Sequence, residues 1–472
     1  MNALAAGALS RRVGRVCVAY VLVELLRFVR FRRLLRKLRT RRYAHQGGGR
    51  GFLLWAKKVL LCDKASLSID RAVLDRYAAE SKTDSCGYGG GRVDWRRVYA
   101  WWAWACGQPF DAPRDPALHA DLLACTDGSC KALGIESPPP SEPAPPQLAV
   151  PPWGYGVCEL RATFKPLPLQ LFLRSLSLCA RTALRALGFR KVTEPMPGGE
   201  LICWSDMPAS GGPRRGAEGR RPVVFLHGLG LGAITYLPLF VGHGGQEWRA
   251  GGCMVVEYPC MTSAWADLEC LPQAVLLADA LGRLLSKQFG AGADMGYDVV
   301  CHSLGTYVAS LLSNEGSPCR PRRSVLVDPV CFLEGSEVVS RFVFLTPDEC
   351  RRFALSTVLF PSCLPLLVRR MLGIVFRQLV CRDIFSQYSA LRWTGTDATS
   401  ILWRNAEAEA LVCLSDDDYF VPAARVAQHC RGHFPNITVF HMPGKDHGSF
   451  VREPALKRKL LERISRFLAQ GS

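Results

Sequence analysis

A serine at the junction of a strand-like run and a helix-like run is the strongest constraint on how this chain of 472 residues can fold. Asp298–Val300 have the composition of a short buried strand, and Thr306–Leu312 place apolar groups at helical spacing. Ser303 lies in the turn between them. Such an elbow holds the serine hydroxyl above the carboxyl edge of a parallel sheet and directs the N–H of Leu304 toward a carbonyl that the hydroxyl attacks. This stretch predicts a nucleophilic serine.

Strand-like and helix-like runs alternate through the last two thirds of the chain. Short apolar runs typical of buried strands are Leu201–Trp204, Pro222–Leu226, Cys253–Tyr258, Ser324–Pro329, Ala410–Leu414 and Ile437–Met442. Longer runs predict helices at Leu167–Leu187, Asp267–Gln288 and Glu453–Leu468. This alternation is typical of α/β proteins, so we expect a doubly wound, mostly parallel sheet.

The turn after the second of these strands is bracketed by glycines, in the order His227, Gly228, Leu229 and Gly230. Glycines there let the backbone approach a bound group closely. A phosphate cradle would use a similar turn, but the sequence has neither a G-x-x-x-x-G-K-[ST] pattern nor a G-x-G-x-x-G pattern with a following acid. A phosphate site at this turn is therefore disfavoured.

Two late loops, each directly after a predicted strand, supply an acid and a base. Ser415–Pro422 contains three consecutive aspartates, Asp416, Asp417 and Asp418, and Pro443–Gly448 contains His447. A serine nucleophile followed in the chain by an acid and then by a histidine is the order of an activated serine on an α/β sheet.

With these four motifs, residues 201–470 resemble the α/β-hydrolase fold serine hydrolases. The G-x-S-x-G elbow of that family stands here as Cys301-His302-Ser303-Leu304-Gly305, with Cys301 in place of the first glycine. The basic N-terminus, the Trp-rich region and the H-G-L-G-L-G-x-x-x-Y-L-P and V-D-P-V-C-F runs look more closely like a little-characterised group of membrane-associated α/β-hydrolases in fungi and algae.

The resemblance implies a role for each candidate site residue. Ser303 would be the nucleophile and His447 the base, and the backbone N–H groups of Leu229 and Leu304 would form the oxyanion hole. The family's acid stands four residues before the proline that opens the next helix, which selects Asp418. Asp416 is the second choice for the acid, and Asp328, after an earlier strand, is a rival.

The remaining polar residues of these motifs have structural roles in the same comparison. His227 and His302 occupy positions where the backbone is used and the ring is not, and Asp446 would shape its loop. The chemistry needs neither a metal nor an organic cofactor.

Positive charge is concentrated at the N-terminus. Residues 1–50 contain 12 Arg, one Lys and a single acid, Glu24, so they carry +12 of the net +18. Val16–Val29 is apolar except for Glu24 and Arg27, and its length of about 21 Å is short of a bilayer core of roughly 30 Å. We expect an interfacial or short membrane anchor, and an organelle transit peptide remains the alternative. Binding to nucleic acid is disfavoured because aliphatic residues alternate with the arginines.

Composition divides the chain further. Residues 51–136 read as a helical, Trp-rich region, residues 137–153 as a Pro-rich linker, and residues 154–472 as the catalytic domain, with a helical cap at about 331–409. The cap contains the apolar run Leu355–Leu379. An apolar cap beside a membrane anchor favours an apolar acyl substrate, and the same residues would equally well form a small core of their own.

The 20 cysteines are scattered, and none forms a C-x-x-C pair. We expect most to be buried thiols in a reducing compartment, and we expect the Cys125–Cys130 segment to be a loop without metal.

The sequence thus predicts a serine esterase, lipase-like, acting on a lipid or other apolar acyl ester, associated with the cytosolic face of a membrane. An acyltransferase with the same residues and a silent hydrolase-fold scaffold are the alternatives, and the oligomeric state stays open.

Overall fold

The structure, a computed structural model, describes residues 19–33, 95, 99, 116–133, 136–137, 162–197, 199–208, 219–241, 247–258, 274–289, 296–314, 317, 319–332, 380–392 and 403–470. The predicted Pro-rich linker, apart from its first residue, the predicted helices at 52–61 and 65–79, most of that at 93–107 and most of the cap, including Leu355–Leu379, lie outside these ranges.

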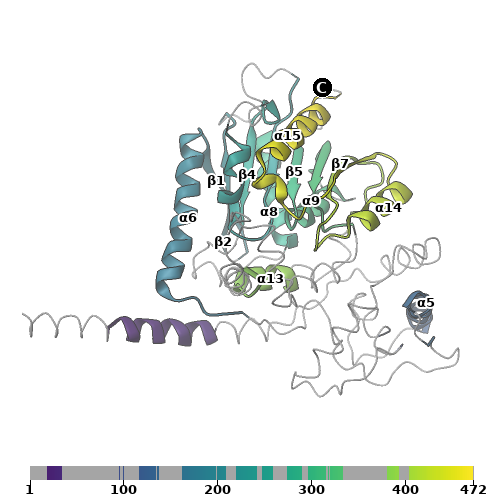
Figure 1. The fold of residues 1–472 in the computed structure, drawn as a ribbon, viewed down its shortest axis with the longest axis horizontal. Coiled ribbons are helices and arrows are strands. Elements are labelled where there is room, and N and C mark those ends of the chain that lie inside the picture. Colours follow the sequence, from purple (N-terminus) through teal and green to yellow (C-terminus); the bar gives the residue numbers. More distant parts are fainter. Residues whose placement is uncertain are drawn as a thin grey trace, which may run out of the picture.

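An eight-stranded sheet in the order β1-β2-β4-β3-β5-β6-β7-β8 forms the centre of the described part (Figure 1). Its strands are β1 (Arg190–Met196), β2 (Gly199–Ser205), β3 (Val223–Leu226), β4 (Cys253–Glu257), β5 (Asp298–His302), β6 (Arg323–Val327), β7 (Glu409–Ser415) and β8 (Ile437–Met442). The pairs β1–β2 and β2–β4 are antiparallel, and the six strands from β4 to β8 in the sheet order pair in parallel. The predicted doubly wound, mostly parallel sheet is confirmed.

Alternate side chains of the central strands enter two separate hydrophobic clusters, one on each face of the sheet. In β3, Val224 and Leu226 belong to one cluster, whereas Val223 and Phe225 belong to the other. Because successive strand residues point to opposite faces, a strand that is apolar throughout must be covered on both sides. This is why the central strands read in the sequence as continuous apolar runs.

Helices cover both faces. The first cluster includes α8 (Ala274–Phe289), α9 (Gly305–Ser313) and α14 (Ala423–His433), and the second includes α6 (Leu167–Ala186), the 3₁₀ helix η2 (Gly232–Leu239) and α15 (Pro454–Ala469). The shorter described elements are a helix at 19–33, α5 (Pro116–Leu133), α13 (Ile384–Arg392) and the 3₁₀ turn η5 (Ser449–Val451). Within the described ranges, no helix reaches the length and hydropathy that crossing a membrane requires.

The structure corrects the prediction for the Cys125–Cys130 segment, which lies inside helix α5 and is not a loop. Gly128 and Ser129 suggest a break, but side-chain contacts one turn apart support the helix. The Thr126 hydroxyl donates to the carbonyl of Leu122 at 2.7 Å, and Lys131 pairs with Asp127 at 2.7 Å. The side chains of Cys125 and Cys130 are buried.

Candidate active site

The elbow after β5 places Ser303 at the end of a central strand. Ser303 has a φ of +51°, which a residue other than glycine adopts rarely and at a cost, and its N–H donates to the carbonyl of Val327 on β6 at 3.0 Å. Two residues later, a Cβ on Gly305 would stand 2.5 Å from the carbonyl oxygen of Leu226. Glycine is therefore required where α9 passes β3.

Cys301, which departs from the family's elbow pattern, is accommodated without a clash. Its side chain is fully buried in the first hydrophobic cluster, and its thiol lies 3.3 Å from the carbonyl oxygen of Val325. Burial raises the pKa of this thiol well above its usual value, so it stays protonated. Cys301 is thus a core residue that packs on one face of the sheet.

The structure brings Ser303, His447 and Asp418 into one hydrogen-bonded chain. His447 Nε2 lies 2.9 Å from Ser303 Oγ, and His447 Nδ1 lies 2.6 Å from Asp418 Oδ2. Because an ionised carboxylate can only accept, Nδ1 carries the proton, and Nε2 accepts from the serine hydroxyl. The three residues are each less than a tenth exposed.

The loops after β7 and β8 supply the other two members. Asp418 follows β7, and its Oδ1 accepts the N–H groups of Phe420 and Val421 at 2.7 and 3.0 Å, which holds the carboxylate in place. His447 follows β8 and precedes Gly448, whose φ of +71° turns the loop back. Asp446 pairs with Arg452 at 2.9 Å, in keeping with a loop-shaping role.

The rival aspartates lie elsewhere. Asp416 pairs with the half-exposed His441 at 2.7 Å, away from His447. Asp328 is completely buried and accepts hydrogen bonds from the Ser415 backbone at 2.9 Å and the Gly448 backbone at 2.9 Å. Asp328 therefore joins the end of β6 to the end of β7 and to the loop that carries His447.

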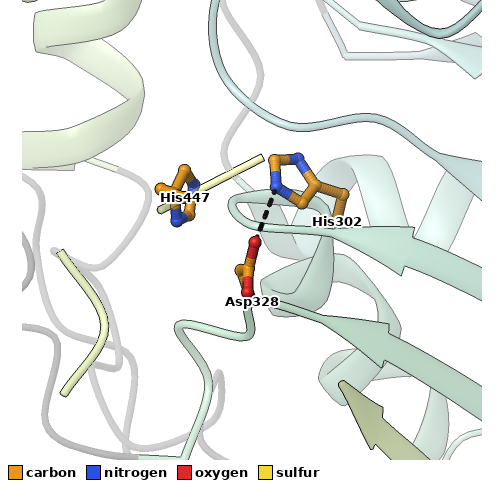
Figure 2. A group of neighbouring side chains, drawn as sticks. All are labelled: His302, Asp328 and His447. Carbon is orange, nitrogen blue, oxygen red and sulfur yellow. Dashed lines mark ion pairs between the residues drawn. The ribbon is translucent and has the colours of Figure 1, made fainter. Parts of the chain in front are cut away.

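A second histidine also lies beside the site (Figure 2). The ring of His302 lies 4.9 Å from the ring of His447, and its Nε2 lies 3.7 Å from Asp328 Oδ2. On its other side, Nδ1 is 2.7 Å from the hydroxyl of Tyr236, which accepts the N–H of Gly228 at 2.9 Å. A proton on Nε2 would face the carboxylate of Asp328, and Nδ1 would then accept from the Tyr236 hydroxyl.

This network connects the glycine turn after β3 to the elbow. A Cβ on Gly228 would stand 2.7 Å from His302 Nδ1, 2.8 Å from the Tyr236 hydroxyl and 3.1 Å from Ser303 Cβ, so only glycine fits. The turn that carries Leu229 is thereby held against the serine, and Leu304 directly precedes α9. The sequence pointed to the backbone of His302 alone. The ring contact and Tyr236 could not be foreseen, because no motif links residues 66 positions apart.

Charge in the site is arranged around His447. Burial acts to lower the pKa of His447, but the charge of Asp418, its hydrogen bond and the charge of Asp328 outweigh burial and raise it. His302 behaves in the opposite way, since burial lowers its pKa to about 4 and keeps the ring neutral. Burial opposes the charge of Asp328, but hydrogen bonding and the neighbouring histidines hold the pKa of Asp328 below its usual value.

Donor atoms of His302, Asp328 and His447 lie within 4.8 Å of one another, as in a metal site. However, both ring nitrogens of His447 already have partners, Ser303 and Asp418. A cation bound there would have to displace one of these hydrogen bonds. The donor set is better suited to proton transfer than to a resident metal.

A parallel sheet with helices on both faces, and a serine elbow aligned with a histidine and an aspartate after later strands, define an enzyme of the α/β-hydrolase class. In agreement, residues 223–456 match the model of the Alpha/beta hydrolase family. That segment therefore has the α/β-hydrolase fold. A comparison with curated proteins gave no match.

Solved structures with detectable similarity include a bacterial membrane phospholipase A (16% identity, TM-score 0.41), which covers 64% of this chain and 94% of its own. A carboxylesterase from a metagenomic library, EstE1, has 16% identity and a TM-score of 0.39 over 64% of this chain and 97% of its own. Carboxylesterase CesB from Bacillus subtilis has 12% identity and a TM-score of 0.39 over 63% of this chain and 100% of its own. The sequence identities and TM-scores are too low for these structures to bear on the substrate or the mechanism of this protein.

Proposed function

We propose that the protein is a serine hydrolase that cleaves carboxylic esters through an acyl-enzyme. The observation that carries the proposal is the hydrogen-bonded chain from Ser303 Oγ through the His447 ring to Asp418 Oδ2. This geometry is what an activated serine requires, and each contact lies within hydrogen-bonding distance.

In the proposed reaction, Ser303 Oγ attacks the ester carbonyl while His447 Nε2 takes its proton. Asp418 orients the ring and stabilises the imidazolium. His447 then gives the proton to the departing alcohol, which leaves an acyl group on Ser303. In the second half of the reaction, His447 takes a proton from water, which attacks the acyl-enzyme. His447 then returns the proton to Ser303 Oγ, and the carboxylic acid is released.

The oxyanion of each tetrahedral intermediate would accept the backbone N–H groups of Leu229 and Leu304. Support comes from the close packing of the Gly228 turn on Ser303 and from the start of α9 directly after Leu304. One such donor contributes about 2.7 to 4 kcal/mol to lowering the barrier. The proposed reaction uses the ester, water, the side chains of Ser303, His447 and Asp418, and the two backbone N–H groups.

An apolar acyl ester, such as a lipid, is the proposed substrate class, and the cytosolic face of a membrane is the proposed location. The helix at 19–33 supports this, because its exposed residues include Val21, Leu22, Leu25 and Leu26 together with Arg30. A helix with exposed aliphatic and cationic residues suits the interface of an anionic bilayer.

The test is labelling of the purified chain with a fluorophosphonate probe, which forms a covalent bond with activated serines. We expect labelling of the wild type, none of Ser303→Ala, and at most a trace of His447→Ala. The matched control is His441→Ala. His441 also pairs with an aspartate, Asp416, but this pair does not include a serine.

Labelling that survives Ser303→Ala, or a folded wild type that does not react, would contradict the proposal. A labelled enzyme would then be tested on p-nitrophenyl esters of increasing acyl length, with water or an alcohol as the acceptor. Preference for the alcohol would indicate an acyltransferase with the same residues.

A further inference from the structure

Exposed large apolar side chains are unevenly distributed over the described part of the chain. Eight of the twelve belong to the helix at 19–33, three belong to α6, and the last is Val241. On α6 these are Leu171, Phe172 and Leu178, which are 55%, 59% and 62% exposed. Scattered exposed residues need no explanation, but a concentration on two elements indicates an interaction surface.

The two helices that share these residues are in contact with each other. Phe28 and Phe31 pack edge-on against Phe164, just before α6, at ring distances of 5.5 and 5.6 Å. The carboxylate of Glu24 accepts the N–H of Leu167, the first residue of α6, at 2.6 Å. In Figure 1 the helix at 19–33 runs across the foot of α6 and projects beyond it. The start of α6 is therefore joined directly to the helix at 19–33.

The joint also takes up the two charged residues that interrupt the apolar run of the N-terminal helix. Glu24 pairs with Arg27 at 2.7 Å, and Arg27 reaches the side chain of Gln170 on α6. Glu24 is the only acid among residues 1–50. Its charge is matched by Arg27 and by the positive end of the α6 dipole. Between Tyr20 and Val29, every exposed residue has an aliphatic or aromatic side chain.

The outward face of α6 is an apolar stripe at helical spacing. Its exposed positions 168, 171, 172, 175, 178, 179 and 182 recur every three or four residues, whereas Leu173, Ala180 and Leu184 are buried. The helix contains no acidic residue, and Arg174 and Arg185 are exposed beside the stripe. Apolar stripes flanked by cations suit an anionic lipid surface.

We propose that the exposed face of α6 binds the interface of an anionic phospholipid bilayer and that α6 and the helix at 19–33 form one membrane-docking surface. The inference builds on the proposed membrane location and does not depend on the proposed catalysis. Exposed arginines on both helices, Arg30, Arg32 and Arg33 on one and Arg174 and Arg185 on the other, supply the charge complementarity that selects lipid as the occupant.

The docking surface is tied to the catalytic domain through the connection between β6 and β7. Between the two helices, the Thr163 N–H donates to the Arg382 carbonyl at 2.8 Å, and Lys165 pairs with the buried Asp383. Both partners belong to the connection between β6 and β7, which begins at Asp328. A membrane bound by this surface would therefore be held next to the connection that leaves the sheet at the catalytic edge.

The test is sedimentation of the full-length chain with phosphatidylcholine vesicles, with and without phosphatidylserine. We compare the wild type with a triple variant, Leu171→Ser, Phe172→Ser and Leu178→Ser. The control variant, Ser175→Ala with Thr182→Ala, changes polar residues of the same exposed stripe. We expect the triple variant to bind anionic vesicles at least about tenfold more weakly and the control to bind like the wild type.

The outcomes separate the two membrane proposals. Wild-type binding by the triple variant would overturn the role of α6 and leave the N-terminal anchor standing. A wild type that does not bind would overturn both. Fluorophosphonate labelling reports independently whether the active site of each variant is folded.

A second measurement on the unaltered chain covers the case in which the triple variant does not fold. Cys179 is the one exposed cysteine among those the structure describes, and it lies within the stripe beside Leu178. Alkylation of the peptide that contains Cys179, followed by mass spectrometry, should be rapid in solution and slowed about tenfold by anionic vesicles. Equal rates with and without vesicles would overturn the proposal, and so would protection without vesicles, because another part of the chain would then cover the stripe.

Discussion

His447 stands between two carboxylates that hold it in different ways. Asp418 is bonded to Nδ1, whereas Asp328 acts on the ring through its charge and through the N–H of Gly448, the next residue. Asp418 therefore orients the imidazole and also favours its protonation, whereas Asp328 has no hydrogen bond to the ring and acts on its protonation through charge.

Replacing each carboxylate by an amide should separate these effects. Protonated His447 cannot accept the serine proton, so kcat/KM falls as the pH drops through the raised pKa of His447. Asp328→Asn removes a charge that favours the imidazolium, which lowers this pKa, so the acid limb should move to lower pH. Asp418→Asn should move the acid limb in the same direction and, in addition, reduce kcat by about 10⁴, because the ring loses its orientation.

The measurement is the pH dependence of kcat/KM on a p-nitrophenyl ester, with Asp416→Asn as the surface control. An acid limb that stays in place in Asp328→Asn, or a small effect of Asp418→Asn, would show that the two carboxylates are assigned to the wrong tasks.

Among the helices, α9 and α8 each contain a glycine, and the two glycines differ in their surroundings. A Cβ on Gly305 would meet the backbone oxygens of Leu226 and His227 at 2.5 and 2.9 Å, whereas a Cβ on Gly282 in α8 would meet nothing within 4 Å. The first glycine permits close packing of helix on strand, and the second only adds flexibility to a helix.

Alanine at these positions should therefore have opposite effects on stability. Gly305→Ala should lower the free energy of unfolding by about 1 to 3 kcal/mol, because backbone atoms would have to move. Gly282→Ala should raise it by up to about 1 kcal/mol through better helix propensity. Urea unfolding followed by circular dichroism measures both changes. Equal effects would mean that the elbow relaxes around the added methyl group.

Which strands could be predicted depended on how deeply they are buried. Strands β3, β5, β7 and β8 are continuous apolar runs or lie between clear turn signals, and the predicted ranges overlap them closely. The edge strand β1 was missed, because it contains Lys191, Glu194 and Pro195. In the described sheet its one neighbouring strand is β2, with which it pairs in antiparallel. Its strand character comes from the pairing with β2, which no local pattern in this segment reveals.

The candidate site, like the strands, could be predicted only in part. The order of the strands predicted Ser303, the aspartate loop and His447 at one edge of the sheet, and the resemblance to the family's spacing before Pro422 selected Asp418 over Asp416. By contrast, Tyr236 and the His302 ring reach the site through side-chain packing across 66 residues of chain. Spacing along the sequence carries no information about such contacts.

At the scale of the complete fold, one buried ion pair fastens the segment before α6 to the connection between β6 and β7. The side chains of Lys165 and Asp383 are 8% and 2% exposed. Asp383 also accepts the N–H of Ser386 at 3.0 Å at the start of α13. A surface pair of the same kind, Lys131 with Asp127, has its lysine 70% exposed.

Breaking the buried pair should destabilise the protein far more than breaking the exposed one. Lys165→Met leaves an uncompensated buried carboxylate and should cost about 3 to 5 kcal/mol, whereas Lys131→Met should cost less than about 1 kcal/mol. Adding Asp383→Asn to Lys165→Met should restore part of the loss, because the amide is neutral and its oxygen can still accept from Ser386. Thermal unfolding of the three variants and the wild type measures this, and a double variant less stable than Lys165→Met alone would contradict it.

The base of the long connection between β6 and β7 is closed by hydrogen bonds on both sides. Asp328 donates its N–H to the carbonyl of Cys413 at 2.8 Å, and Trp403 donates its N–H to the carbonyl of Cys331 at 2.8 Å. Once the two ends of a loop are pinned, doubling its length adds only about 0.6 kcal/mol of closure entropy. The segment between these ends can therefore change in length during evolution at little cost in stability, while Ser303, Asp418 and His447 keep their places.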